Sequence, residues 1–244
     1  MYHSIDATGS PISVDPATFR AHVMWLARGP VRVLPVAELA GAGVEEDAVA
    51  LTFDDGFANL ETEAAPLLAD HGLPATVYVV PGAVGGTNAW GGRDAPGIPT
   101  LPLLDWDGIG RVRERGMEVG AHTRTHRPLP SLSPAELEDE VAGGGVAIAA
   151  ATGTRPDSFA YPYGAYDRAS ARMVADRYTW GVTTDLRPLA RNENAALLPR
   201  LDAWYFRQPG RLEAWGSARF RWRLRARGAA RRVRETFRPA GGRA

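Results

Sequence analysis

Two short segments contain the side chains of this sequence that are best suited to hydrolytic chemistry. Asp54 and Asp55 close one apolar stretch, and His122 and His126 follow another such stretch about seventy residues later. Two imidazoles and one carboxylate form an N₂O donor set with open positions, which is typical of catalytic rather than structural zinc. The second carboxylate then stays free to accept a proton. Because the chain has no cysteine, any zinc must be held by His, Asp or Glu.

This donor set favours hydrolysis of a carbonyl or phosphoryl compound. A metal lowers the pKa of its bound water from about 16 toward about 7, so hydroxide is available at neutral pH. The spacing of His122 and His126 turns both rings the same way if the segment forms a helical turn. Asp-Asp-Gly after a strand is also ordinary turn chemistry. The conjunction of both segments, in a chain with only five His, favours the metal site.

Short apolar stretches alternate with helical patterns, which predicts parallel strands connected by helices. The predicted strands are Tyr2–Ile5, Val31–Leu34, Ala48–Phe53, Ala75–Val80, Met117–Ala121, Ser158–Tyr161, Thr179–Val182 and Leu197–Leu201. The predicted helices are Pro16–Arg28, Leu60–His71, Leu104–Arg115, Pro134–Ala151 and Arg168–Arg177. Active sites of such folds gather where the strands end, and the candidate residues all follow predicted strands.

The sequence resembles a known family in three motifs. Thr52–Gly56, His122–His126 and Tyr161–Gly164 resemble, in this order and spacing, the first three motifs of the polysaccharide deacetylases, carbohydrate esterase family four, with its chitooligosaccharide-deacetylase-like homology domain. The resemblance extends from Tyr2 to about Asp202. It implies an α/β fold, a distorted (β/α) barrel of about seven strands, and removal of acetyl groups from N-acetylated sugars with a divalent metal, usually zinc.

The resemblance also implies roles for individual residues. Asp54 corresponds to the general base, and Asp55, His122 and His126 correspond to the metal ligands. The backbone N–H of Tyr163 corresponds to a donor that helps to hold the oxyanion.

The sequence departs from the family pattern at two positions. Ala160 replaces the arginine that usually orients the base, and we expect Arg200 to substitute for it. No His follows His126, so the usual general acid is missing. We expect His3 to replace it, because the first and last strands of a closed barrel end side by side. A surface His in a frayed terminus is the alternative.

Two tryptophans are candidates for stacking on a sugar ring. Trp90 lies in the predicted loop Pro81–Pro102, and Trp106 lies at the head of a predicted helix. Large aromatic side chains are also common in protein cores, so core packing is the alternative for both.

The net charge of zero conceals an uneven distribution. All 28 basic residues are Arg, and residues 205–244 hold 12 of them against two Glu. We therefore divide the chain into a catalytic domain at residues 1–204 and an Arg-rich amphipathic tail at residues 205–244.

One face of this tail carries apolar side chains at helical spacing. They are Trp222, Ala226, Ala229, Val233 and Phe237. This stripe either packs on the barrel or anchors the helix to an anionic membrane surface. The sequence favours packing, since Gly228 interrupts the helix and the stripe is partly Ala. One short basic helix is weak evidence for nucleic-acid binding, and we expect no nucleic-acid partner.

We therefore expect a carbohydrate N-deacetylase, a hydrolase of non-peptide carbon–nitrogen bonds in an acetamido sugar. The carbohydrate substrate belongs to a glycan, a glycolipid precursor or a glycosylated metabolite. The alternatives are an O-acetyl esterase on the same fold and a catalytically weak, metal-containing carbohydrate-binding protein. No signal-peptide pattern or membrane-spanning stretch occurs in the sequence, so we expect a cytoplasmic location, or a peripheral one at the inner membrane face if the tail binds lipid.

Overall fold

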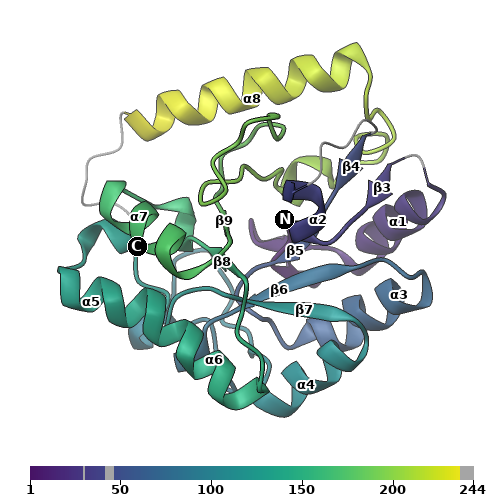
Figure 1. Cartoon of the computed structure of the whole chain (residues 1–244). Helices are drawn as coiled ribbons and strands as arrows, with labels where there is room; N and C mark the ends of the chain where they lie inside the picture. The colour runs from purple at the N-terminus through teal and green to yellow at the C-terminus, as the bar shows by residue number, and fades with distance from the viewer. Residues whose placement is uncertain (30, 42–46, 237–244) are drawn as a thin grey trace.

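The structure, a computed structural model, describes residues 1–29, 31–41 and 47–236. Its centre is a parallel sheet of five strands in the order β5-β6-β7-β8-β9, with helices packed around it (Figure 1). The strands are β5 (Leu51–Phe53), β6 (Ala75–Val79), β7 (Met117–Ala121), β8 (Ser158–Ala160) and β9 (Trp180–Val182). The predicted α/β fold is confirmed as a distorted (β/α) barrel, although the main sheet has fewer strands than expected.

Four short strands form two separate two-stranded sheets, and isolated bridges extend the edges of the main sheet. The separate parallel pairs are β1 (Ser4–Ile5) with β2 (Ser13–Val14) and β3 (Arg32–Val33) with β4 (Ala48–Val49). Tyr2 bridges Phe53 of β5 at one edge, and Leu198 bridges Val182 of β9 at the other. Both edges of the main sheet are therefore extended by short segments, one from the start of the chain and one that follows β9.

The prediction of a strand at Leu197–Leu201 is wrong. The Leu198 N–H donates to the Gly181 carbonyl at 2.7 Å, and its carbonyl accepts from the Thr183 N–H at 2.8 Å, but the ladder does not continue. The next N–H that would face β9, that of Arg200, donates to the Asp185 carbonyl at 3.1 Å, so the regular pairing ends there. The segment still runs beside β9.

Each of the five predicted helices is present, two of them with a π-helical turn, and a further short helix at Val36–Gly41 was not predicted. The helices are α1 (Pro16–Ala27), α2 (Val36–Gly41), α3 (Ala65–Asp70), α4 (Trp106–Glu114), α5 (Pro134–Glu138), α6 (Gly144–Thr152), α7 (Arg168–Arg177) and α8 (Ala218–Thr236). A π-helical turn at Leu60–Ala64 precedes α3, and another at Asp139–Gly143 joins α5 to α6. The side chains of Asp15, Ser133 and Asp167 accept backbone N–H groups at the starts of α1, α5 and α7. These caps satisfy donors that have no partner inside the helix.

Large apolar side chains fill the space between the sheet and the helices. The largest fully buried ones include Phe19, Phe53, Phe57, Leu60, Ile109, Ile148 and Phe159. Because such interiors are close-packed, the strand ends that project from this core are held firmly.

The helix α8 lies on the outside of the barrel, beside the segment that follows β9 (Figure 1). It packs through Phe220, Leu224 and Gly228, of which Leu224 and Gly228 are buried. Gly228 therefore does not break the helix, contrary to expectation, but lies in its packed face. Among the described residues, no helix has the length and apolar character needed to cross a membrane.

The apolar stripe predicted for α8 does not pack on the barrel. Trp222 is 69% exposed, and Ala226 and Ala229 are also exposed. The stripe faces outward because the packed face lies on the opposite side of the helix. Phe237 lies outside the described residues, and the environment of the Val233 side chain is not described.

A candidate metal centre and its neighbouring carboxylate

Asp54 and Asp55 follow β5 directly, at the carboxyl edge of the sheet. The Asp54 N–H donates to the Tyr2 carbonyl at 2.9 Å, which continues the strand pairing past Phe53. Asp55 then turns away with a φ of 74°. This change of backbone direction lets the two carboxylates point to different partners.

The His122–His126 segment is a loop, not the helical turn that we expected. Thr123 and His126 have φ values of 61° and 65°, in the left-handed region. The Thr123 hydroxyl accepts the His126 N–H at 2.9 Å and closes the loop. Both imidazoles nevertheless converge on Asp55.

The side chains of Asp55, His122 and His126 could hold a metal ion together. The Asp55 Oδ1 atom lies 3.3 Å from His122 Nε2 and 3.2 Å from His126 Nε2. All three residues are buried, and Asp55 Oδ1 has no hydrogen-bond partner among the described residues. A buried, unpartnered carboxylate oxygen is costly in a folded protein, and coordination of a cation removes that cost. The donor set of one carboxylate and two imidazoles therefore fits a divalent metal.

Each imidazole is anchored by the ring nitrogen that does not face Asp55. The His122 Nδ1 donates to the Ala160 carbonyl at 2.7 Å, since a carbonyl can only accept. The His126 Nδ1 lies 3.2 Å from the Tyr163 hydroxyl. Such partners fix the ring orientation and present Nε2 as the metal ligand.

Glu140 holds the loop that carries the histidines, and sequence analysis missed this residue. Its carboxylate accepts the N–H groups of Arg124 at 2.9 Å and Thr125 at 2.8 Å, together with the Thr125 hydroxyl. Glu140 is only 3% exposed. A sequence signal existed, because this carboxylate lies between the buried positions Leu137 and Val141 on the apolar face of the helix.

A close approach of the same helix supports this arrangement. A Cβ added to Gly144 would lie 2.9 Å from the Thr123 carbonyl carbon. Only glycine lets the start of α6 come this near to the metal-binding loop.

Arg200 binds Asp54 with both ends of its guanidinium. The two contacts are 2.6 Å (Nη1 to Oδ1) and 2.7 Å (Nη2 to Oδ2), and Arg200 Nε also donates to the Thr183 carbonyl at 2.8 Å. Burial by itself would raise the pKa of Asp54, but the charge and hydrogen bonds of Arg200 hold it at about 2. Asp54 is therefore an ionised carboxylate in a fixed orientation.

The structure places His3 beside the same carboxylate. Its Nε2 lies 3.9 Å from Asp54 Oδ2, and its side chain is 22% exposed. The pairing of Tyr2 with Thr52 and Asp54 positions the neighbouring His3, since the Tyr2 N–H donates to the Thr52 carbonyl at 2.8 Å. This His thus lies in the candidate site and not in a frayed terminus.

Tyr163 borders the triad on the side of β8. Its φ is 59°, and none of the described backbone hydrogen bonds uses its N–H. Burial raises the pKa of its phenol to about 12, with a smaller contribution from Asp55. The hydroxyl is therefore neutral at physiological pH and remains available to the His126 ring.

Backbone strain is concentrated in this site. Among the described residues, positive φ outside glycine occurs only at Asp55, Thr123, His126 and Tyr163. Each left-handed residue costs about 1–3 kcal/mol and persists only where its surroundings enforce it, and such residues cluster at functional sites.

The structure separates the two candidate tryptophans. Trp90 stacks on His126, with ring centroids 4.1 Å apart and an interplanar angle of 25°. Trp106 lies at the start of α4 and packs against the main hydrophobic core. Among the described ring contacts, none joins Trp106 to the site.

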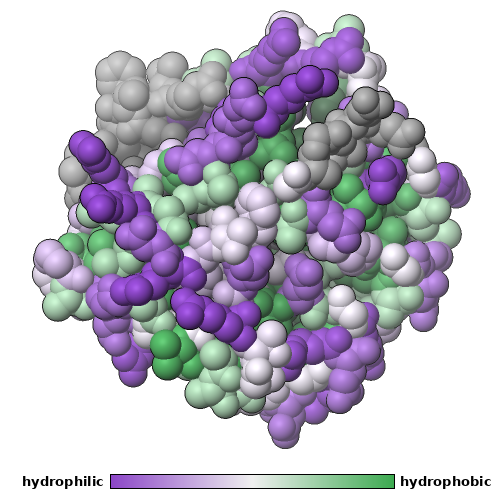
Figure 2. Space-filling model, in the orientation of Figure 1, coloured by the Kyte–Doolittle hydropathy of each residue, from purple (hydrophilic) through white to green (hydrophobic). Residues whose placement is uncertain are grey.

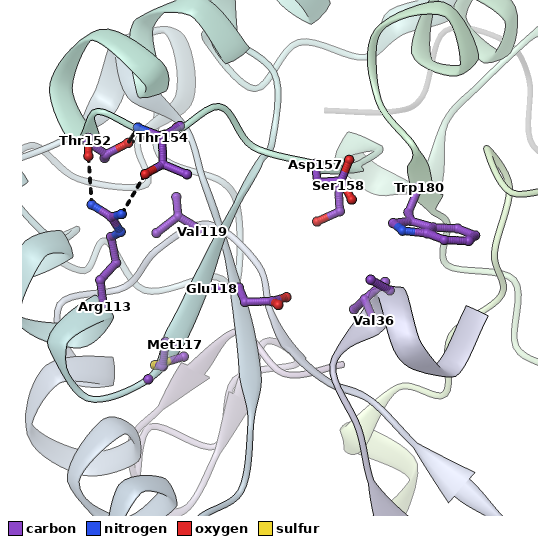
Figure 3. A pocket seen from close by; sticks show the side chains of 12 residues that line it. Val36, Arg113, Met117, Glu118, Val119, Thr152, Thr154, Asp157, Ser158 and Trp180 are labelled. Atoms are coloured by element: carbon purple, nitrogen blue, oxygen red, sulfur yellow. Dashed lines mark hydrogen bonds between the residues drawn. The ribbon is translucent and has the colours of Figure 1, made fainter. Parts of the chain in front are cut away.

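A cavity of about 420 Å³ opens at the amino ends of β7, β8 and β9, at the end of the sheet opposite the candidate site (Figure 3). Its charged side chains already have partners. Arg113 donates to the Thr152 carbonyl and the Thr154 hydroxyl, and Glu118 accepts from Thr76. This cavity contains no cluster comparable to the triad among the described residues.

Comparison with known proteins connects this site to a family. A family model described as polysaccharide deacetylase matches residues 41–179. The Bacillus subtilis (strain 168) protein YxkH, provisionally described as a polysaccharide deacetylase, is 24% identical over 207 residues, 82% of this chain and 69% of the relative. A chitooligosaccharide deacetylase of Bradyrhizobium sp. (strain ANU 289) is 33% identical over 149 residues, 59% of each chain.

A solved structure has the same fold. The Streptococcus pyogenes deacetylase PplD, in complex with acetate, has a TM-score of 0.69 and 21% identity, covering 83% of this chain and 89% of that chain. At this identity the similarity establishes a shared architecture.

Proposed function

Because the chain belongs to the polysaccharide deacetylase family, whose model matches more than half of it, we propose that the protein is a metal-dependent hydrolase that removes the N-acetyl group from an acetamido sugar. The sugar would be part of a glycan, a glycolipid precursor or a glycosylated metabolite. The observation that carries the proposal is the division of the two neighbouring carboxylates, with Asp55 facing two imidazoles and Asp54 facing a guanidinium.

Asp55, His122 and His126 would hold the metal. Two nitrogen donors and one oxygen donor with open positions are a common ligand set of catalytic Zn²⁺, which we propose as the metal. When bound, such a cation supplies Lewis acidity, which makes water a better nucleophile and the acetamide carbonyl a better electrophile.

The residues around the triad would manage the protons and the developing charge. Asp54, ionised and oriented by Arg200, accepts a proton from the attacking water. The Tyr163 N–H donates to the oxyanion of the tetrahedral intermediate. His3 protonates the leaving amine, and Trp90 provides an apolar wall for the sugar or its acetyl group.

One observation favours O-acetyl ester hydrolysis as a second candidate. His3 lies 3.9 Å from the base itself, and no His follows His126 in the sequence. An alcohol leaves more readily than an amine, so an ester substrate needs less help from a general acid.

The proposal is tested by acetate release from N-acetylated oligosaccharides, a nucleotide-linked N-acetyl sugar and an O-acetylated sugar, with zinc content measured in parallel. Asp54→Asn keeps the shape of the side chain but removes the base, and general-base catalysis is worth about 10²–10⁴-fold. We expect kcat to fall by that factor while the zinc content stays unchanged. Asp176→Asn, at an exposed position of α7, is the matched control.

Full activity of the zinc-loaded Asp54→Asn protein would refute the mechanism. Release from the ester but not from the amides would favour the second candidate. Zinc binding without turnover of any acetylated sugar would favour a carbohydrate-binding protein.

A further inference from the structure

The helix α8 is held on the barrel by one face, and its contacts fix its orientation. The Phe220 ring lies 5.9 Å from Phe206 and 4.9 Å from Trp215, centroid to centroid. Further along, the Arg227 guanidinium lies over the Tyr205 ring at 4.8 Å. These contacts near the start and at the middle of α8 keep its other face turned outward.

The opposite face of α8 combines apolar and cationic groups. Trp222, Ala226 and Ala229, spaced by four and three residues, form an exposed stripe along the helix. Arg219 and Arg225 lie on the two sides of this stripe and are exposed as well. Figure 2 shows hydrophilic side chains gathered along this helix at the top of the molecule.

The charge of α8 is strongly positive. Its sequence contains eight Arg against one Glu. The rest of the chain compensates this charge, since the net formal charge of the whole protein is zero. The basic groups are therefore localised on one surface, not spread over the molecule.

The helix also lies near the candidate site. Arg231 donates to the Thr184 hydroxyl at 2.9 Å. A Cβ added to Gly164, the neighbour of Tyr163, would lie 2.0 Å from that same hydroxyl oxygen. The carboxyl-terminal part of α8 is thus connected to the edge of the site through a single side chain.

We propose that the outward face of α8 docks the protein on the surface of an anionic membrane. Arginines pair with anionic headgroups, and Trp222 enters the interfacial layer, where indole rings are most stable. The alanines between them let the helix lie flat on the lipid. The proposed membrane contact is independent of the hydrolytic chemistry. It does not depend on which acetylated substrate the site accepts.

Two other partners, a second copy of this chain and a nucleic acid, fit this face of α8 less well. A second copy would bring two rows of arginines together, and the narrow stripe is too small for a stable dimer, which buries about 1,200–2,000 Å². A nucleic acid would use the arginines but leaves no role for an exposed apolar stripe with Trp222 at its centre.

The test is co-sedimentation of the full chain with vesicles. We expect binding to phosphatidylcholine vesicles containing about one third phosphatidylglycerol, little binding to pure phosphatidylcholine, and release by salt. Arg219→Glu/Arg225→Glu should weaken the vesicle affinity at least about tenfold, because each arginine near an anionic surface contributes and each glutamate opposes. Trp222→Ala should weaken binding by removing the interfacial ring.

The matched control is Arg168→Glu/Arg172→Glu on α7, which changes the net charge equally at two exposed positions. It should bind like the wild type, and all variants should keep their melting temperature and their activity on a soluble substrate.

Absence of wild-type binding, equal binding to neutral vesicles, equal loss in the control, or no loss in the α8 variants would overturn the proposal. So would self-association or DNA binding through the same residues in place of vesicle binding. Vesicle binding without acetate release would leave this proposal standing and remove only the enzymatic one.

Discussion

Two adjacent aspartates acquire different properties from their surroundings alone. Asp54 accepts two hydrogen bonds from a buried guanidinium, whereas Asp55 lies between two imidazoles and keeps an oxygen to which none of the described residues donates a hydrogen bond. The left-handed backbone at Asp55 makes this divergence possible. Under the proposed function, Asp54 would serve as the base and Asp55 as a metal ligand, the two halves of a hydrolytic site.

Glu140 provides the test at the scale of a single residue. Glu140→Gln keeps the size of the side chain but removes its charge, which weakens the bonds from the N–H groups of Arg124 and Thr125, because hydrogen bonds to an ionised carboxylate are stronger. Outer partners of metal ligands are worth about 10–100-fold in metal affinity, so we expect the dissociation constant for Zn²⁺ to rise by that factor. Competition with a chromogenic chelator measures it.

Glu138→Gln is the matched control for this prediction. It changes the same side chain two residues earlier, at a position paired with Arg177 on the surface. Zinc affinity equal to the wild type in the Glu140 variant, or an equal loss in both variants, would show that the loop does not depend on this carboxylate.

The side chains of the triad were predictable from sequence, but their support was not. Residue types and spacing indicated Asp55, His122 and His126, because each follows a strand. The supporting contacts go mainly to backbone groups, such as the Ala160 carbonyl and the N–H groups held by Glu140, and backbone groups leave no mark on the sequence. The expectation of a helical turn at His122–His126 was wrong because contacts to backbone N–H groups hold this segment as a loop.

Secondary structure was predictable where the elements are long and periodic. The prediction for α7 matches the structure at both ends, and β7 does so as well. It failed at Leu197–Leu201, where the pairing with β9 ends after the single bridge at Leu198. Short elements such as α2 escaped prediction, since six residues are too few to establish a period.

The start of α5 allows a pH test at the scale of an element. Ser133 and Glu136 form a capping box, in which Glu136 accepts the Ser133 N–H at 2.8 Å and the Ser133 hydroxyl at 2.7 Å. These bonds to Ser133, with help from Arg127, lower the pKa of Glu136 to about 2 from its usual 4.5. Because the folded-state pKa is depressed, the stabilisation is complete above about pH 4.5 and is lost as the pH falls toward 2.

We therefore expect Glu136→Gln to lower the free energy of unfolding at pH 7, with a difference from wild type that narrows steadily below about pH 4.5. Urea denaturation of both proteins at a series of pH values measures this difference. Glu63→Gln, at an exposed position, is the matched control. A difference that is constant or grows with acidity would contradict the role of the capping box.

Metal binding should be visible in the stability of the whole molecule. The ligands come from two separate segments at the ends of β5 and β7, so a cation that binds only the folded state links them. At a free zinc concentration about 100 times the dissociation constant, this adds about 2.7 kcal/mol, or a rise of about 5–10 °C in the melting temperature.

Scanning calorimetry with zinc and after chelation measures this shift. The shift should disappear in Asp55→Ala, which removes the orphaned oxygen. An equal shift in wild type and variant would place the metal elsewhere in the molecule.

The orientation of α8 shows a limit of sequence analysis at the scale of the molecule. Periodicity found the stripe containing Trp222 but assigned it to the inside. The structure packs the face of Phe220, Leu224 and Gly228, since glycine allows close approach and carries no hydropathy signal. Which of two faces is buried depends on the surface that the barrel offers.

The contact between Arg200 and Asp54 joins residues 146 positions apart, whereas the three candidate metal ligands all precede residue 127. The segment after β9 contributes the guanidinium that orients Asp54 and none of these candidate ligands. Changes in that segment are therefore expected to disturb the orientation of Asp54 and to leave the candidate ligand set in place.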